Sequence, residues 1–101
     1  IVSGKMTLRK LIRSLEKGII VPMSRAAWES VAGSMQPLET VETIETGLAG
    51  QILLLRGPGS GWAIVEEPQP DARVVRPLAG EAEARALIAD RLAAYERMWD
   101  G

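Results

Sequence analysis

The sequence contains no cysteine and no histidine, and its aromatic residues are three tryptophans and one tyrosine. Without cysteine the chain has no disulfide framework, no thiolate nucleophile and no zinc–thiolate site. Without histidine it lacks the most common general base and the most common neutral metal ligand. An enzyme built from this sequence would have to use carboxylates, lysine or tyrosine, and we expect neither a metal nor another cofactor.

Long apolar runs are also missing. The apolar runs, such as residues 19–21 and 52–55, are no longer than four residues, whereas a helix that spans a membrane needs about 20 apolar residues. No signal-peptide pattern is present. We therefore expect a cytoplasmic protein that makes no membrane contact.

The length and composition are those of one ordinary globular domain. The chain has 101 residues, 47% of them hydrophobic and 25% charged, and its formal net charge is −1. This is enough for a single core and is not a composition typical of disorder. Met6 is placed like an initiator, so residues 1–5 are expected to be a cloning remnant or a flexible arm, and residues 6–101 to form a single α+β domain.

The most informative stretch is residues 51–67, QILLLRGPGSGWAIVEE. Its first half is apolar at four consecutive positions, which predicts a strand that is buried on both faces, with Leu54 in its interior. The glycines and the proline of residues 57–61 suit a tight reversal. Residues 62–65 form a second apolar run, which ends before Pro68. We therefore predict a β-hairpin at the centre of a small sheet.

The same glycines follow a strand, as glycines do in a phosphate-binding loop. That motif requires a lysine and then serine or threonine after its last glycine, at the start of a helix. Trp62 and Ala63 occupy these positions here, and β-branched residues follow. A hairpin turn without phosphate affinity is the favoured interpretation.

An amphipathic helix is predicted at the N-terminal end. Residues 8–15 carry apolar side chains at helical spacing, with Thr7 as N-cap and Gly18 as the stop signal. The other side of this helix is basic. Its basic residues include Arg9, Arg13 and Lys17. Such a face is commonly only solvated, but it is also a surface that can contact phosphates or an acidic partner.

The next segments are a link, a second helix and an apolar-Glu-Thr triplet repeat. Pro22 keeps the link before it extended, and Ser24 caps a short helix over residues 25–32. The triplet repeat spans residues 38–46. Its spacing of three is compatible with a helix, whereas its β-branched residues favour an edge strand that its glutamates protect from further pairing. The sequence leaves residues 36–46 open between strand and helix, with the strand favoured.

A further strand and the longest helix follow the hairpin. Residues 73–76 are expected to pair with the hairpin, opposite Glu66 and Glu67. The helix is expected from Gly80 to Trp99, with Arg91 inside its apolar arc. Because a charge there needs a partner or water, two arrangements are open: the stem of Arg91 lies on the sheet while its head reaches water, or Arg91 is paired. We predict that Arg91 is largely buried and engaged by a carboxylate or by backbone carbonyls, with Glu66 or Glu67 as the favoured acid.

Together these elements predict an α+β fold in the order α-α-β-β-β-α. It would contain a small antiparallel sheet of three or four strands around the hairpin, two N-terminal helices and one long C-terminal helix. One helix can cover only one face of residues 52–55, so the other face needs the N-terminal helices or another subunit. We therefore expect contact with another protein or with a second copy of the chain.

Three functions are compatible with this sequence, and the first is favoured. It is a small non-catalytic binding module, that is, an accessory, adaptor or regulatory domain that acts by protein–protein contact. Its candidate contact residues are Arg56, Trp62, Arg91 and Trp99.

The other two functions have less support. Nucleic-acid binding would use Arg9, Arg13 and Lys17, but the net charge of −1 and the few aromatic residues argue against it. An enzyme would have only one candidate cluster, without paired carboxylates or an obvious base. Its members are Arg56, Trp62, Glu66 and Arg91.

Overall fold

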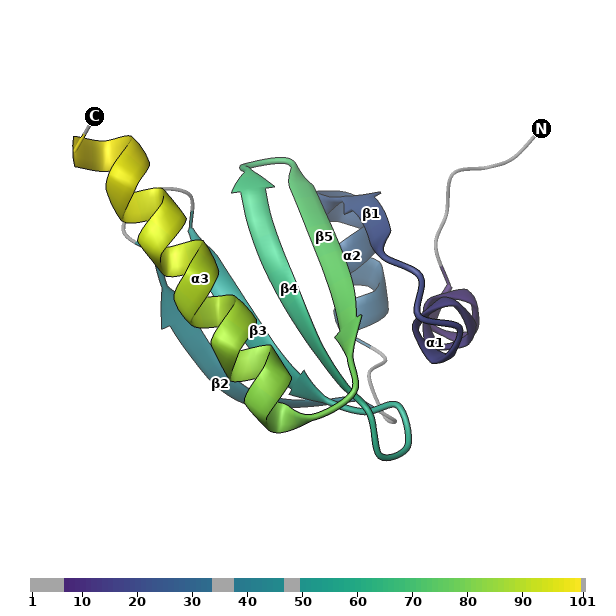
Figure 1. Ribbon diagram of the computed structural model, residues 1–101. Helices are drawn as coiled ribbons and strands as arrows, with labels where there is room; N and C mark the ends of the chain where they lie inside the picture. Colours follow the sequence, from purple (N-terminus) through teal and green to yellow (C-terminus); the bar gives the residue numbers. More distant parts are fainter. Residues whose placement is uncertain (1–6, 34–37, 47–49, 101) are drawn as a thin grey trace.

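The computed structural model describes residues 7–33, 38–46 and 50–100, without the side chains of residues 98–100. The expectation for residues 1–5 lies outside these residues and stays a prediction. Helices and strands alternate at first and a run of four strands follows (Figure 1). The elements are α1 (Leu8–Glu16), β1 (Val21–Ser24), α2 (Arg25–Ala32), β2 (Glu39–Glu45), β3 (Gln51–Arg56), β4 (Trp62–Gln69), β5 (Ala72–Leu78) and α3 (Glu81–Asp100).

The strands form one antiparallel sheet of five strands in the order β1-β5-β4-β3-β2. The predicted α+β class is confirmed, whereas the predicted number of three or four strands is wrong. The additional strand is β1, which forms where a link was expected and pairs Val21 with Val75 of β5. Pro22 is tolerated in β1 because an edge strand has one side on which no ladder partner is needed.

The strands β3 and β4 form the predicted hairpin, and β4 is the middle strand of the sheet. Leu54 and Ile64 are register partners, and both are fully buried. The turn is closed by the Gly57 backbone N–H, which donates to the Gly61 carbonyl oxygen at 2.7 Å. Gly57 and Gly59 have φ values of 118° and 60°, which glycine adopts without a steric penalty.

The triplet repeat forms β2, the exposed edge strand next to β3. The strand interpretation is therefore confirmed, and the helical alternative is wrong. Glu39 is ion-paired with Arg56, and Glu42 lies 2.9 Å from Arg85. These two glutamates thus engage separate arginines and do not gather around a shared cation.

Both N-terminal helices begin at the predicted caps. The side-chain oxygens of Thr7 and Ser24 each accept a hydrogen bond from the backbone N–H three residues later, at 3.2 and 3.1 Å. These bonds satisfy amides that have no partner inside a helix. Among the described residues, no helix is long and apolar enough to cross a membrane.

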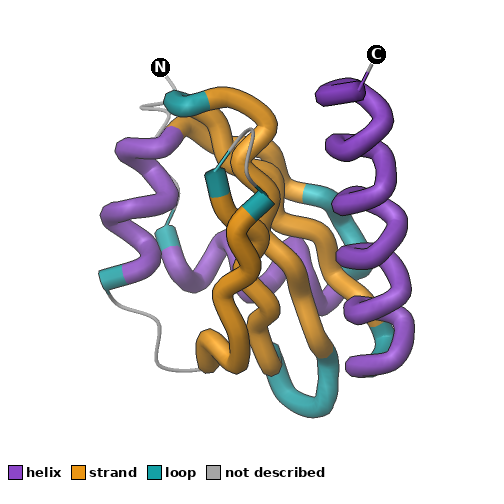
Figure 2. Tube along the Cα trace, turned by 90° about the vertical axis from the view of Figure 1, so that its left-hand side faces the viewer, coloured by secondary structure: helices purple, strands orange, loops and turns teal. Residues whose placement is uncertain are grey.

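The sheet separates two apolar layers, one under α3 and the other under α1 and α2 (Figure 2). The strand β3 contributes to both layers. Ile52 and Leu54 belong to the layer under α3, whereas Leu53 and Leu55 belong to the layer under α1 and α2. Both faces of β3 are therefore covered by the chain's own helices, and the argument that a second subunit must cover this strand does not hold.

Candidate functional site

Glu66 is a carboxylate buried under α3. It lies on β4 across from Ile52 of β3, on the face of the sheet that also carries Leu54 and Ile64. Only 2% of its side chain is exposed. A carboxylate at such a depth has to be paired or hydrogen-bonded, because burial removes its hydration.

Three side chains from β5 and α3 meet this carboxylate. Arg76 donates from Nε to Glu66 Oε1 at 2.7 Å, and Arg91 donates from Nε to Glu66 Oε2 at 2.8 Å. Tyr95, one turn after Arg91, donates its hydroxyl to Glu66 Oε2 at 3.2 Å. We call Glu66, Arg76, Arg91 and Tyr95 the Glu66 cluster. With the two arginines and the glutamate ionised, its net charge is +1.

The electrostatics of the cluster keep its donors protonated. The hydrogen bond to Glu66 and the negative charge of Glu66 raise the pKa of the Arg91 guanidinium. Burial raises the pKa of the Tyr95 hydroxyl, and the charge of Glu66 adds to this effect. Glu66 accepts bonds at both oxygens and is closed off from solvent, so its position suits an anchor for the arginines better than a general base.

The predicted pairing of Arg91 with a carboxylate is confirmed, but the prediction that Arg91 is largely buried is wrong. Its side chain is 35% exposed, and that of Arg76 is 31% exposed. Both bind Glu66 through Nε, and within the described residues neither guanidinium has another carboxylate or carbonyl acceptor. The reason is that α3 covers only part of the sheet (Figure 1). Arg76 is on β5, most of which α3 leaves uncovered, and Arg91 reaches Glu66 from α3 itself.

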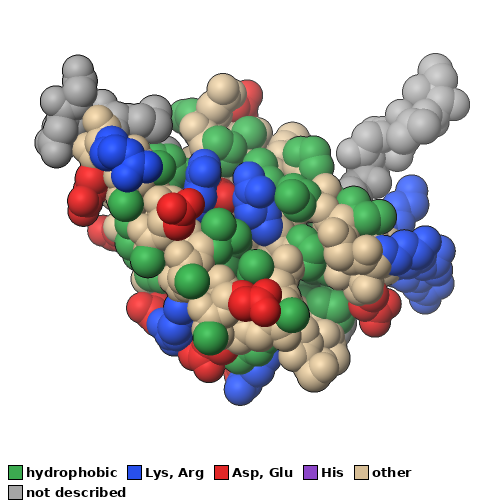
Figure 3. Space-filling view, viewed as in Figure 1, with side chains coloured by type: hydrophobic (Ala, Val, Ile, Leu, Met, Phe, Trp, Pro, Cys, Tyr) green, Lys and Arg blue, Asp and Glu red, His purple; other side chains and the backbone are tan. Residues whose placement is uncertain are grey.

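The part of the sheet beside α3 forms a surface that we call the open face, made of Pro22, Val74 and Arg76. The helix α3 packs on β3, on β4 and on the Leu78 end of β5, and Figure 1 shows no described helix over the rest of β5 or over β1 on this side. Pro22 and Val74 are register partners, Pro22 being exposed and Val74 half-buried. On this side of the molecule, hydrophobic side chains lie among Lys and Arg side chains (Figure 3).

The other predicted contact residues lie elsewhere. Arg56 and Trp62 are register partners at the turn end of the hairpin; Arg56 is exposed, and Trp62 lines a cavity of about 460 Å³ between α1, the turn and the end of β5. Trp62 lies four positions before Glu66 on β4, about 13 Å away along the strand. The four residues of the enzyme hypothesis are therefore not assembled into one site, and the side chain of Trp99 lies outside the described residues.

The basic face of α1 is exposed, as expected for a solvated helix surface. Arg9, Arg13 and Lys17 all lie on it. Arg9 and Arg13 also line a depression of about 400 Å³ together with Leu8 and Ile12. In contrast to the Glu66 cluster, no buried carboxylate among the described residues anchors these cations.

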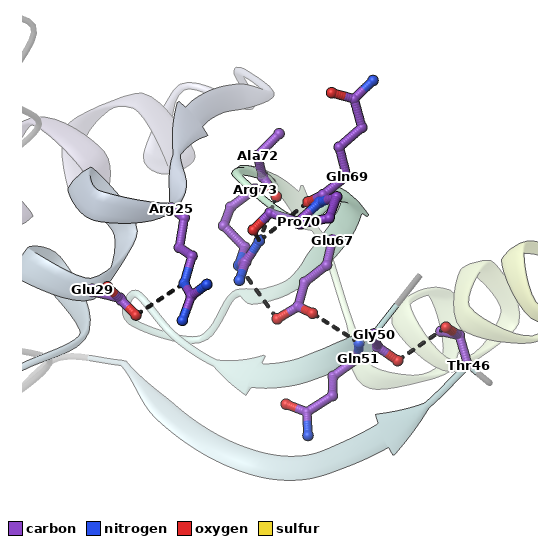
Figure 4. A network of polar contacts seen from close by, with 10 residues as sticks. All are labelled: Arg25, Glu29, Thr46, Gly50, Gln51, Glu67, Gln69, Pro70, Ala72 and Arg73. Atoms are coloured by element: carbon purple, nitrogen blue, oxygen red, sulfur yellow. Dashed lines mark hydrogen bonds and ion pairs between the residues drawn. The ribbon is translucent and has the colours of Figure 1, made fainter. Parts of the chain in front are cut away.

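A second ion pair joins Arg73 to the partly exposed Glu67 (Figure 4). Arg73 is the register partner of Met23, on the face of the sheet under α1 and α2. Arg73 Nε is 3.3 Å from Glu67 Oε2, and Arg73 Nη1 donates to backbone carbonyls of the turn between β4 and β5. Glu67 Oε1 accepts from the Gln51 backbone N–H at 3.1 Å. A Cβ atom at Gly50 would collide with this oxygen. These bonds join two turns within the protein, so we assign this pair a structural role.

The sequence narrowed the pairings of the Glu66 cluster without fixing them. It placed Arg73 and Arg76 in the strand opposite Glu66 and Glu67, and it gave Arg91 either glutamate as its partner. It did not show that Arg76 and Arg91 share one carboxylate, nor that Tyr95 joins them. One signal in the sequence could have shown that Glu66 is buried. Side chains alternate between the two faces of a strand, and this alternation puts Glu66 on the same face as the apolar Ile64.

Comparison with known proteins assigns the chain to no family. No family model, no curated protein and no solved structure matches the chain. The functional argument therefore rests on the residues described above.

Proposed function

We propose that the protein is a small non-catalytic binding module that acts by protein–protein contact through the open face. The observation that carries the proposal is that partly exposed apolar residues and two anchored arginines occupy the same surface. Pro22 and Val74 supply the apolar part, and Arg76 and Arg91 flank it. Arginine among apolar side chains is typical of protein contact surfaces, in which arginine is a frequent hot-spot residue.

The anchoring by Glu66 also favours binding over catalysis. A long arginine side chain loses rotamer freedom when it joins an interface, and this loss weakens association. Here the bonds from Nε to Glu66, at 2.7 and 2.8 Å, already hold both guanidinium groups. The cluster thus presents ordered donors and offers no exposed base.

Val74→Gln tests the proposal, with Val41→Gln as its matched control. Val74 lies on the open face, whereas Val41 is 40% exposed on β2 at the other edge of the sheet. Both changes replace an apolar side chain by a polar one. Affinity capture with quantitative mass spectrometry should give a protein whose recovery falls about fourfold for Val74→Gln. Val74 is half-buried in the free protein, so a partner buries the remaining half of its side chain, which is worth about 0.8 kcal/mol. Recovery with Val41→Gln should equal that of the wild type.

Light scattering coupled to gel filtration tests whether the partner is a second copy of the chain. If the chain self-associates through the open face, Val74→Gln shifts it towards the monomer and Val41→Gln does not. Equal capture and equal mass for the two variants would show that the open face is not the contact surface.

Nucleic-acid binding through α1 is the second candidate, and the exposure of Arg9, Arg13 and Lys17 supports it. Binding of this kind depends strongly on salt, because phosphate contacts release counterions. Fluorescence anisotropy with random duplex DNA at low and moderate salt tests it. Affinity that falls steeply with salt, and that is lost when Arg9, Arg13 and Lys17 are all replaced by serine, would favour this candidate.

A further inference from the structure

We infer that Arg76 and Arg91 form a binding site for a carboxylate group of a partner polypeptide. The apolar residues beside this carboxylate would contact the open face. The inference rests on the proposed function and specifies the chemistry of the partner. It is carried by the juxtaposition of two partly exposed arginine side chains on one buried carboxylate.

The first argument is an excess of charge. Glu66 carries one negative charge, which one arginine neutralises, yet two arginines bind it at 2.7 and 2.8 Å. The cluster therefore keeps one positive charge beside an apolar surface. A ligand with a single negative charge, such as a carboxylate, balances it, whereas a phosphate monoester with about two charges overcompensates it.

The second argument is the supply of donors. A guanidinium has five N–H donors in a planar fork, and each of these arginines uses its Nε to bind Glu66. Within the described residues, the Nη groups of Arg76 and Arg91 reach no second carboxylate or carbonyl. Their side chains are 31% and 35% exposed, so a ligand has access. Planar forks match a planar carboxylate better than a lysine ammonium would.

The third argument is the immediate surroundings. Pro22 and Val74 are neighbours across β1 and β5 on the same face as Arg76. A carboxylate beside an apolar side chain therefore matches the surface better than a free inorganic anion. The C-terminal carboxylate of an apolar residue has this chemistry.

Binding is tested with N-acetyl-leucine, which has one carboxylate and one apolar side chain, and with its carboxamide as the uncharged control. The readout is the side-chain Nε–Hε NMR signal of each arginine at constant ionic strength. N-acetyl-leucine should shift the Arg76 and Arg91 signals in a saturable manner. The carboxamide should bind at least about tenfold more weakly, as expected for the loss of one charge-assisted hydrogen-bond pair.

Variants identify the arginines that bind. Arg91→Met should weaken N-acetyl-leucine binding at least about tenfold, and Arg91→Lys should also weaken it because the fork is lost while the charge and the fold are kept. Arg25→Met is the control, since Arg25 is an exposed arginine paired with Glu29 on α2. It should bind like the wild type.

Three outcomes would overturn the inference: equal binding of the acid and the carboxamide, shifts of equal size at all arginines, or tighter binding of inorganic phosphate than of N-acetyl-leucine. These outcomes are separable from failure of the proposed function. If N-acetyl-leucine does not bind but Val74→Gln still loses its captured partner, only the carboxylate assignment is wrong. If Val74→Gln captures like the wild type, the open face is not the contact surface.

Discussion

Glu66→Gln is the sharpest test of the cluster, because it keeps the shape of the side chain and removes its charge. Removing one partner from a buried ion pair costs about 3–5 kcal/mol. Here the side chains of Arg76 and Arg91 are 31% and 35% exposed, so water replaces part of the lost interaction. The glutamine amide keeps one acceptor oxygen, but its NH2 group takes the place of the other oxygen and so faces an N–H or O–H donor. We expect the free energy of unfolding to fall by about 2–3 kcal/mol.

Urea unfolding, followed by tryptophan fluorescence, measures this change, and the slope of the transition checks that only stability has changed. Arg91→Met should cost less, about 1 kcal/mol, since Glu66 retains Arg76 and Tyr95. Combined with Glu66→Gln, Arg91→Met should have almost no further effect, because the charge that Arg91 paired with is gone. A Glu66→Gln midpoint equal to that of the wild type, or losses that simply add in the double variant, would refute the role of Glu66 as an anchor.

Other predictions concern the core, a turn and the loss of stability at alkaline pH. Leu54 is fully buried, so Leu54→Ala should cost about 2–5 kcal/mol in urea unfolding; an unchanged midpoint would contradict this. Gly50→Ala should cost more than Gly59→Ala, because both glycines have positive φ but only a Cβ at Gly50 collides with Glu67; equal losses would argue against the clash. Burial raises the pKa of Tyr95 above its ordinary value of 10.0, so the folded state holds this proton more tightly than the unfolded state. Stability from this source is complete below pH 10.0 and declines as the pH rises above it, and Tyr95→Phe should remove this decline. Tyr95 is the only tyrosine, so phenolate absorbance follows it directly, and ionisation at the ordinary pKa would refute the prediction.

Most of the fold was predictable because its signals are local. The caps Thr7 and Ser24 and the glycine-rich turn of the hairpin need only a few neighbouring residues to be recognised. The strand β1 was not predictable in this way. Four residues that include a proline have no strand pattern of their own, and Val21–Ser24 is a strand because it pairs with β5. Such tertiary pairing regularly outweighs local preference in strands.

The site was predictable only in part. The helical angle of Arg91 was sufficient to predict a carboxylate partner, because a charge among apolar side chains requires one. Its exposure could not be predicted, since this depends on where α3 crosses the sheet and therefore on the packing of all the strands. Tyr95 was counted with the apolar residues of α3, because periodicity does not show where a hydroxyl group points.

The position of β1 in the sheet has a consequence for the order of folding. The strands β2 to β5 are joined to their neighbours by short connections, whereas Val21 of β1 pairs with Val75 of β5. Closing a long loop costs more entropy than closing a short one, and non-local pairing is slow. We expect pulsed hydrogen exchange to protect the amides of β3 and β4 before those of β1, and simultaneous protection would contradict this. On the ribosome, β1 is synthesised before the other four strands of this sheet, yet it would find its place in the sheet after β3 and β4.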